Sequence, residues 1–199
     1  MRLLHFSLLA LAFVCASVQA AVKTGDAAPD FTLTDTTGAT HSLSDFKGKY
    51  VVLEWTNHQC PFVNKFYSKG DMQAFQAEVT GDGAVWLQIV SSAKGKQGYV
   101  TAAEGEALRV SQKMASTAML LDSNGLVGKQ YNAKTTPHMF LINPEGVLVY
   151  QGAIDSIRST RSADIASAVN YLEKAYAAAT AGESIDPDTT TPYGCSFKY

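Results

Sequence analysis

Hydrophobic residues gather in several short runs whose length is typical of β-strands. Residues 50–55 and 84–90 are almost continuously apolar, as expected of strands covered on both faces of a sheet. Residues 118–121 predict a further short strand. Two hairpins are expected as well, one over 31–43 around a polar turn and one over 138–151 around the turn sequence Asn-Pro-Glu-Gly.

Other segments carry apolar residues at helical spacing. The pattern predicts helices over 61–78, 101–114 and 162–179, and a short helical segment over 126–131. Gly70 is a weak point in the middle of the first of these. Helices alternating with strands, closed by a hairpin, predict an α/β architecture with a mixed central β-sheet flanked by helices.

The first 20 residues are typical of a secretory signal peptide. One early positive charge precedes a short apolar core, and small residues ending at Ala20 provide a cleavage pattern. We expect cleavage after Ala20, which would remove Cys15 with the peptide. The apolar core is too short to span a membrane, and no later run reaches spanning length. The protein is therefore expected to be exported, to the periplasm in a bacterium and otherwise into the secretory or extracellular space.

The remaining chain of about 180 residues is long enough for one domain with a substantial core. We expect that domain over 22–178, followed by an irregular tail over 179–199 that is rich in Gly, Asp, Pro and Thr. The net charge of the chain after cleavage is about −3, which gives no indication of a nucleic-acid or anionic-membrane partner.

Two cysteines, Cys60 and Cys195, remain after cleavage. In an oxidising compartment, two cysteines are first interpreted as one structural disulfide. Cys60, however, directly precedes Pro61 at the predicted start of a helix, where free N–H groups and the helix dipole favour a thiolate. A redox-active or nucleophilic Cys60 is therefore the first hypothesis, and the structural disulfide stays open as the alternative.

Four motifs, in chain order, resemble the thioredoxin-fold redoxins, specifically their exported AhpC/TSA-type and TlpA-like branch. They are the opening segment 25–33, the strand–cysteine–helix unit around Cys60, the segment 135–142 with Pro137, and the hairpin 143–152. The resemblance covers about residues 22–178. It implies a thioredoxin-like fold whose N-terminal β-hairpin is an extension of the sheet.

The chain also departs from its relatives at informative positions. A thioredoxin motif has a second cysteine three residues after the first, where this chain has Val63. A peroxiredoxin carries threonine three residues before its cysteine, where this chain has Asn57, and no arginine lies in a recognisable peroxide-binding motif. Any partner of Cys60 within the mature chain must therefore be Cys195.

The resemblance also assigns roles around Cys60. Glu54 lies six residues before it, where thioredoxins hold a buried carboxylate, so a raised pKa and a role as proton shuttle are expected, with a structural hydrogen-bonding role as the alternative. The bond between Thr136 and Pro137 should be cis. The backbone of Thr136 would then pair with the backbone of a substrate.

Asn57, His58 and His138 are the remaining candidates for substrate or sulfur contacts, with simple packing equally expected for His138. Together with Cys60 they could suit a soft metal, but no ligand spacing supports one. We therefore expect no metal and no cofactor.

The main functional hypothesis is an exported thiol-dependent oxidoreductase. Cys60 would be the nucleophile and Cys195 the resolving cysteine, with a thiol or disulfide protein as partner and an external reductant. A peroxidase acting on hydroperoxides with the same cysteines is the alternative. Two non-enzymatic alternatives stay open: a copper-binding module, and a redox-inert domain with a permanent Cys60–Cys195 disulfide.

Overall fold

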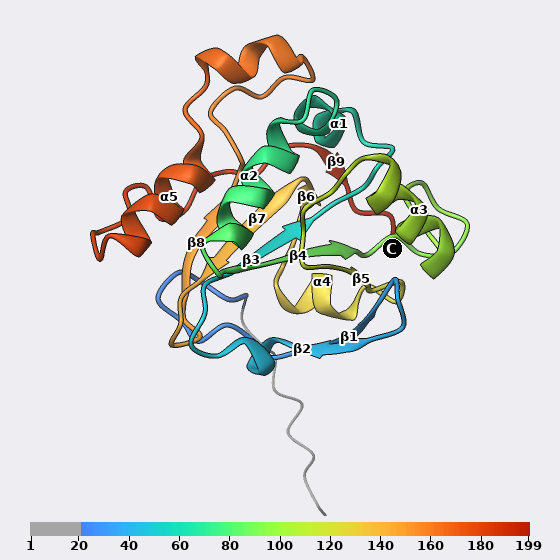
Figure 1. Cartoon of the computed structure of the whole chain (residues 1–199), viewed down its shortest axis with the longest axis horizontal. Coiled ribbons are helices and arrows are strands. Elements are labelled where there is room, and N and C mark those ends of the chain that lie inside the picture. The colour runs from blue at the N-terminus through green and yellow to red at the C-terminus, as the bar shows by residue number, and fades with distance from the viewer. Residues whose placement is uncertain (1–20) are drawn as a thin grey trace, which may run out of the picture.

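A seven-stranded mixed sheet forms the centre of the protein (Figure 1). The computed structural model describes residues 21–199, so the expected signal peptide, with Cys15, lies outside the described residues. The strand order is β2-β1-β5-β4-β3-β7-β8. The strands are β1 (Thr32–Asp35), β2 (Thr40–Ser42), β3 (Val51–Trp55), β4 (Val85–Val90), β5 (Ala118–Leu121), β7 (His138–Ile142) and β8 (Leu148–Gly152).

Strand β4 lies between β3 and β5 and runs parallel to both, while all other neighbours in this sheet are antiparallel. The buried runs of the sequence thus occupy the middle of the sheet, where both faces are covered. The expected α/β class, the mixed sheet and the N-terminal hairpin on the sheet edge are all confirmed.

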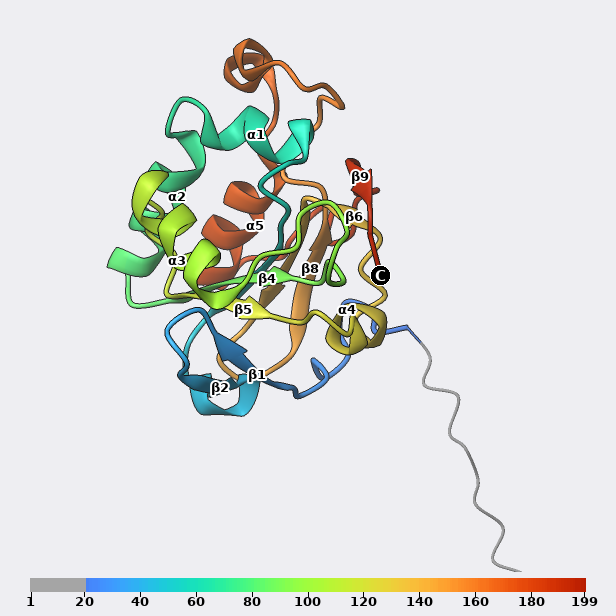
Figure 2. The ribbon, with the colours of Figure 1, turned by 90° about the vertical axis from the view of Figure 1, so that its right-hand side faces the viewer.

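Helices cover both faces of the sheet (Figure 2). One face packs against α1 (Pro61–Tyr67), α2 (Asp71–Gly81) and α5 (Tyr171–Thr180) through a cluster that includes Phe66, Trp86 and Leu172. α3 (Ala102–Ser111) covers β5 on the same side. The other face packs against α4 (Leu126–Gln130) and the 3₁₀ helix η1 (Leu43–Phe46), with Trp55 and Tyr131 at the centre of that cluster.

Two predicted long helices are each divided in two. The predicted helix over 61–78 ends at Tyr67, and α2 starts only after Gly70, whose φ of 90° is accessible to glycine and interrupts the helix. The predicted helix over 162–179 is a 3₁₀ helix, η2 (Ser162–Ser167), followed by α5. Asn170 begins α5 because its side chain accepts a hydrogen bond from the N–H of Glu173 at 3.1 Å.

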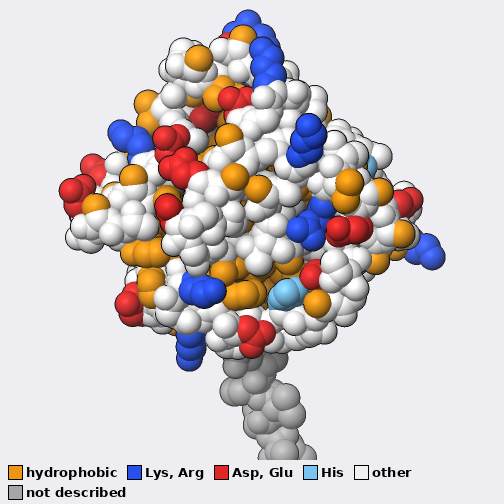
Figure 3. Space-filling view, viewed as in Figure 1, with side chains coloured by type: hydrophobic (Ala, Val, Ile, Leu, Met, Phe, Trp, Pro, Cys, Tyr) orange, Lys and Arg blue, Asp and Glu red, His pale blue; other side chains and the backbone are white. Residues whose placement is uncertain are grey.

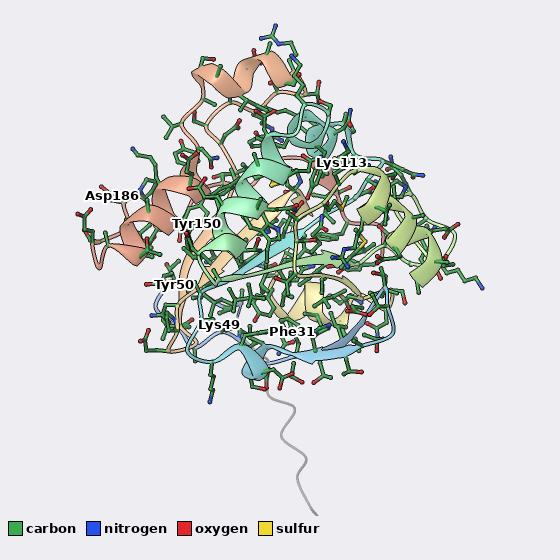
Figure 4. All side chains as sticks on the ribbon, in the orientation of Figure 1. Phe31, Lys49, Tyr50, Lys113, Tyr150 and Asp186 are labelled. Atoms are coloured by element: carbon green, nitrogen blue, oxygen red, sulfur yellow. The ribbon has the colours of Figure 1, made fainter. Side chains whose placement is uncertain are left out.

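The chain after α5 has little regular secondary structure and packs back onto the body of the protein. It first follows the edge of β8, where Thr190 accepts a hydrogen bond from the N–H of Ala153 at 2.9 Å and its hydroxyl lies 2.7 Å from that of Tyr150 (labelled in Figure 4). It then forms β9 (Cys195–Ser196), which pairs antiparallel with β6 (Thr135–Thr136) in a separate two-stranded sheet.

The charge distribution and the composition of the helices bear on possible partners. Figure 3 shows basic and acidic side chains interspersed over one face of the protein. Within residues 21–199, no helix has the length and apolar composition needed to cross a membrane.

Candidate functional site

Cys60 lies where β3 ends and α1 begins. It is the N-cap residue of α1 in an extended conformation, and Pro61 occupies the first helical turn, as predicted. Its N–H donates to the carbonyl of Asn57 at 2.9 Å, which closes the short loop between strand and helix. The Cys60 side chain has no exposed surface.

The loop around Pro137 lies directly against this thiol. The peptide bond between Thr136 and Pro137 is cis, as the resemblance implied. The Cys60 thiol donates a hydrogen bond to the carbonyl oxygen of Thr136 at 3.0 Å. Thr136 belongs to β6, so the Cys60 sulfur faces the edge of a short strand.

The tail brings the second cysteine to the same point. Cys195 pairs with Thr136 in the β6–β9 ladder, and its sulfur lies 2.7 Å from that of Cys60 across 135 residues of sequence. Both cysteines are free thiols in this structure, and Cys195 is partly exposed while Cys60 is buried. Burial, followed by the hydrogen bond with Cys60, raises the pKa of Cys195 to about 12.

A buried charged cluster holds the residue two positions before Cys195. Lys65, on α1, lies 2.6 Å from a carboxylate oxygen of Asp155 and 3.2 Å from the hydroxyl of Tyr193. The Tyr193 hydroxyl also donates a short hydrogen bond to Asp155. Burial, together with this bond and the nearby negative charge, raises the pKa of Tyr193, so its hydroxyl stays protonated and donates.

The sequence analysis did not identify this cluster. Lysine and aspartate are almost never fully buried unless they are paired, and the pattern of apolar positions cannot show that Lys65 and Asp155 meet. The one available signal was Tyr193, an aromatic residue two positions before a cysteine in the tail.

Gly194 lets the tail approach the Pro137 loop closely. A Cβ atom at this position would clash with the carbonyl oxygen of Thr136, which is backbone and cannot move aside as a flexible side chain would. The φ of Gly194 is 147°, which also disfavours a side chain. Glycine is therefore the residue that allows β9 to pair with β6 here.

Glu54 is fully buried under the helices, as predicted. Its carboxylate accepts hydrogen bonds from Tyr67 at 2.8 Å, Trp86 at 2.8 Å and Gln76 at 3.3 Å. Burial raises its pKa, and these hydrogen bonds only partly oppose that effect. Among residues 21–199, the hydrogen bonds of Glu54 do not include one to Cys60, so any proton transfer between them would need an intermediary.

Asn57 shapes the loop before Cys60. Its side-chain oxygen accepts a hydrogen bond from the N–H of Gln59 at 2.8 Å, and its amide is in close contact with Gly98. His58, next to it, is half-buried. Burial lowers the pKa of His58, and the charge of Glu104 opposes that shift.

His138 packs inside the protein. Its Nδ1 accepts a hydrogen bond from the N–H of Lys134 at 3.2 Å, and its ring lies 4.4 Å from that of Phe140. Burial lowers its pKa to about 3, so the ring is neutral near neutral pH. The structure gives His138 a packing environment and no hydrogen bond to a cysteine sulfur in the described part of the chain. No three His, Cys, Asp or Glu residues of 21–199 come together in a way that could hold a metal ion.

Comparison with known proteins shows what this chain is similar to. The model of the AhpC/TSA family matches residues 24–151. A thiol-disulfide oxidoreductase of Geobacillus kaustophilus, ResA, is 43% identical over 54 residues, which are 24% of this chain and 31% of that protein. The chain thus matches only about a third of the length of this curated relative.

Solved structures show the same fold. A hypothetical protein from Sinorhizobium meliloti is 25% identical with a TM-score of 0.76, covering 90% of this chain and 96% of that chain. The exposed lipoprotein thioredoxin of Streptococcus pneumoniae is 26% identical with a TM-score of 0.51, covering 66% of this chain and 93% of that chain. The sheet and its helices are thus thioredoxin-like, and the likeness to the first protein extends over more of the chain.

Proposed function

The chain belongs to the AhpC/TSA family, and on that premise we propose that it is a thiol-dependent oxidoreductase whose redox pair is Cys60 and Cys195. One observation carries the proposal: the two sulfurs lie 2.7 Å apart although 135 positions separate the two residues in the sequence. The relative ResA is named a thiol-disulfide oxidoreductase, which supports the same reaction class for this chain.

In the reaction, two electrons pass between the protein and a partner. The Cys60 thiolate attacks one sulfur of the partner's disulfide, which forms a mixed disulfide and releases the partner's other sulfur as a thiolate. Cys195, deprotonated, then attacks the Cys60 sulfur, which forms the Cys60–Cys195 bond and releases the second partner thiolate. The partner gains two thiols. An external dithiol then reduces the Cys60–Cys195 bond to two thiols and is itself oxidised to a disulfide.

The position of Cys195 suits a resolving role. Attack in line on a disulfide requires the incoming sulfur to approach the bonded one closely, and here the β6–β9 pairing already holds the two sulfurs together. The high pKa of Cys195 means that it reacts once a base or the departing thiolate removes its proton.

The peroxidase alternative has less support from the surroundings of Cys60. Arg109 donates to the carbonyl of Ser116 at 3.0 Å, and Arg161 pairs with Asp164 at 2.9 Å. Arg158, the third arginine of residues 21–199, is exposed. None of the three has Cys60 among its hydrogen-bond partners in the described chain.

We also propose that residues 1–20 direct export and that 22–178 form the redox domain with 179–199 as its tail. Export would place the protein in the periplasm of a bacterium, or outside the cell. One similar protein supports this: the S. pneumoniae thioredoxin is an exposed lipoprotein.

Parallel assays with two substrates test the proposed reaction. Residues 21–199, with dithiothreitol as reductant, are given either a fluorogenic glutathione disulfide or hydrogen peroxide. The wild type should reduce the disulfide far faster than Cys60→Ser. When dithiothreitol is left out, pre-reduced Cys195→Ser should stop after one exchange as a mixed disulfide on Cys60. Cys60-dependent consumption of peroxide without reduction of the disulfide would instead establish the peroxidase.

A further inference from the structure

Residues 193–196 occupy the position beside the Pro137 loop where an extended peptide could bind. Cys195 pairs with Thr136 and Ser196 pairs with Thr135, so the tail adds an antiparallel strand to β6, which has no other strand partner within residues 21–199. Addition of a strand to a free edge is a common mode of peptide recognition. Here the chain supplies that strand itself.

Three attachments hold this strand in place. Tyr193 is buried in the cluster with Lys65 and Asp155, and its ring packs edge-to-face on that of Phe62 at 5.8 Å. The backbone at Gly194 lies against Thr136 too closely for any side chain. Beyond β9, the carbonyl of Lys198 accepts a hydrogen bond from the N–H of Ala93 at 2.9 Å.

The two thiols differ in exposure as a result. Cys60 has no exposed surface beneath the strand, whereas Cys195 is partly exposed. An outside polypeptide therefore cannot reach the Cys60 sulfur while the tail is seated. Such a polypeptide could reach the Cys60 sulfur once residues 193–196 lift away from β6.

We infer that Tyr193, held by Lys65 and Asp155, is a specificity-determining residue that seats residues 193–196 as a built-in substrate strand and so keeps Cys60 from exchanging with cysteine-containing polypeptides. This inference rests on the proposed redox pairing of Cys60 with Cys195. It adds that the exchange partner of Cys60 is chosen by the tail rather than by an open groove.

Cys195 is then the residue that an outside thiol contacts first. In the oxidised protein, an incoming thiolate attacks the more accessible sulfur, that of Cys195; the Cys60–Cys195 bond breaks and Cys60 leaves as a thiolate. A second thiolate attacks the mixed disulfide at the partner's sulfur, which releases Cys195 and forms the partner's disulfide. Two outside thiols are thereby oxidised while the protein gains two electrons and two protons.

The test measures access to Cys60 alone, in a Cys195→Ser background. The probe is a cysteine-containing hexapeptide activated as its mixed disulfide with thionitrobenzoate, whose release is followed by absorbance. Tyr193→Phe removes the hydroxyl and leaves the Lys65–Asp155 pair intact. Because a hydrogen bond to a charged group is lost, we expect the second-order rate at Cys60 to rise roughly ten- to a hundredfold.

Tyr131→Phe is the matched control. Tyr131 is also a buried tyrosine whose hydroxyl donates a hydrogen bond, at 2.6 Å to the carbonyl of Pro29, but this bond is outside the Lys65–Asp155 cluster that holds Tyr193. It should lower thermal stability without changing the rate at Cys60. Equal rises in both variants would mean that general loosening exposes Cys60, which overturns the inference.

Gly194→Ala is a second variant, for the case in which loss of the Tyr193 hydroxyl displaces the strand too little to change the rate. Its added methyl group clashes with the carbonyl of Thr136 and should displace the strand directly. If neither variant accelerates the reaction, the inference is wrong. The proposed function is judged separately, since it depends on turnover by the unaltered Cys60–Cys195 pair.

Discussion

Cys195 lies opposite Thr136 in an antiparallel strand pair, and this pairing places the Cys195 sulfur 2.7 Å from that of Cys60. The carbonyl of Thr136 accepts the hydrogen bond from the Cys60 thiol, so the same residue holds both cysteines. A single short strand pair thus supplies the second thiol that the helix lacks at Val63.

Loss of the nucleophile should remove activity without unfolding the protein. We predict that Cys60→Ser reduces the disulfide-reductase rate by at least about a hundredfold, because serine is not deprotonated at neutral pH and forms no disulfide. Its melting temperature should stay close to that of the reduced wild type. Reductase activity within a few-fold of the wild type would show that another group carries the reaction.

The buried pair of Lys65 and Asp155 should be important for stability. Asp155→Ala leaves the Lys65 ammonium buried without its partner, which should cost about 3–5 kcal/mol of unfolding free energy in urea titrations. Replacing both residues, as Lys65→Met with Asp155→Leu, should recover much of that loss. Asp164→Ala breaks the exposed pair with Arg161 and is the control, expected to have little effect. A comparable loss in the control would contradict the special role of the buried pair.

Asp35 should make the protein sensitive to acid. Burial opposes ionisation of Asp35, but hydrogen bonds from His41 and Thr37 outweigh it and lower its pKa to about 2. A carboxylate with a lowered pKa contributes stability that is present above its unfolded pKa, near 3.8, and is lost as the pH falls toward 2. The urea midpoint of the wild type should therefore fall between pH 4 and pH 2 more steeply than that of Asp35→Asn. Parallel curves for the two proteins would rule out this contribution.

Ionisation of Glu54 should have the opposite effect on folding stability from that of Asp35. Burial raises its pKa above the ordinary value of 4.5, so its ionisation destabilises the folded state as the pH rises through and above that value. Relative to the wild type, Glu54→Gln should gain stability as the pH is raised from 4 to 8, measured as the difference between their urea midpoints. A difference that does not change with pH would mean that Glu54 titrates alike in the folded and unfolded chain.

The strands and the fold class could be predicted because buried strands have a strong local signal. The runs at 50–55 and 84–90 became β3 and β4 almost residue for residue. Helix ends were harder, because the break at Gly70 and the one before Asn170 depend on backbone conformations that apolar periodicity does not encode. The resemblance supplied the fold and the cis bond before Pro137.

The site was predictable only in part. Cys60 and Cys195 were identified because few cysteines remain in the mature chain, and the structure places them together. His138 was predicted as a possible sulfur contact; its Nδ1 accepts a hydrogen bond from the N–H of Lys134, and the contact to sulfur stays a prediction. The Lys65–Asp155–Tyr193 cluster could not be predicted, since it joins three distant segments through a buried ion pair.

A redox titration of the wild-type pair tests the central claim most directly. The fraction of Cys60–Cys195 disulfide is measured by acid quenching, alkylation and mass spectrometry after equilibration at a series of ratios of reduced to oxidised glutathione. A reversible pair should give a two-electron curve with its midpoint inside the glutathione range, reached from both the reduced and the oxidised protein. A disulfide that stays fully formed at every ratio would show that it is permanent and structural, and would contradict the account.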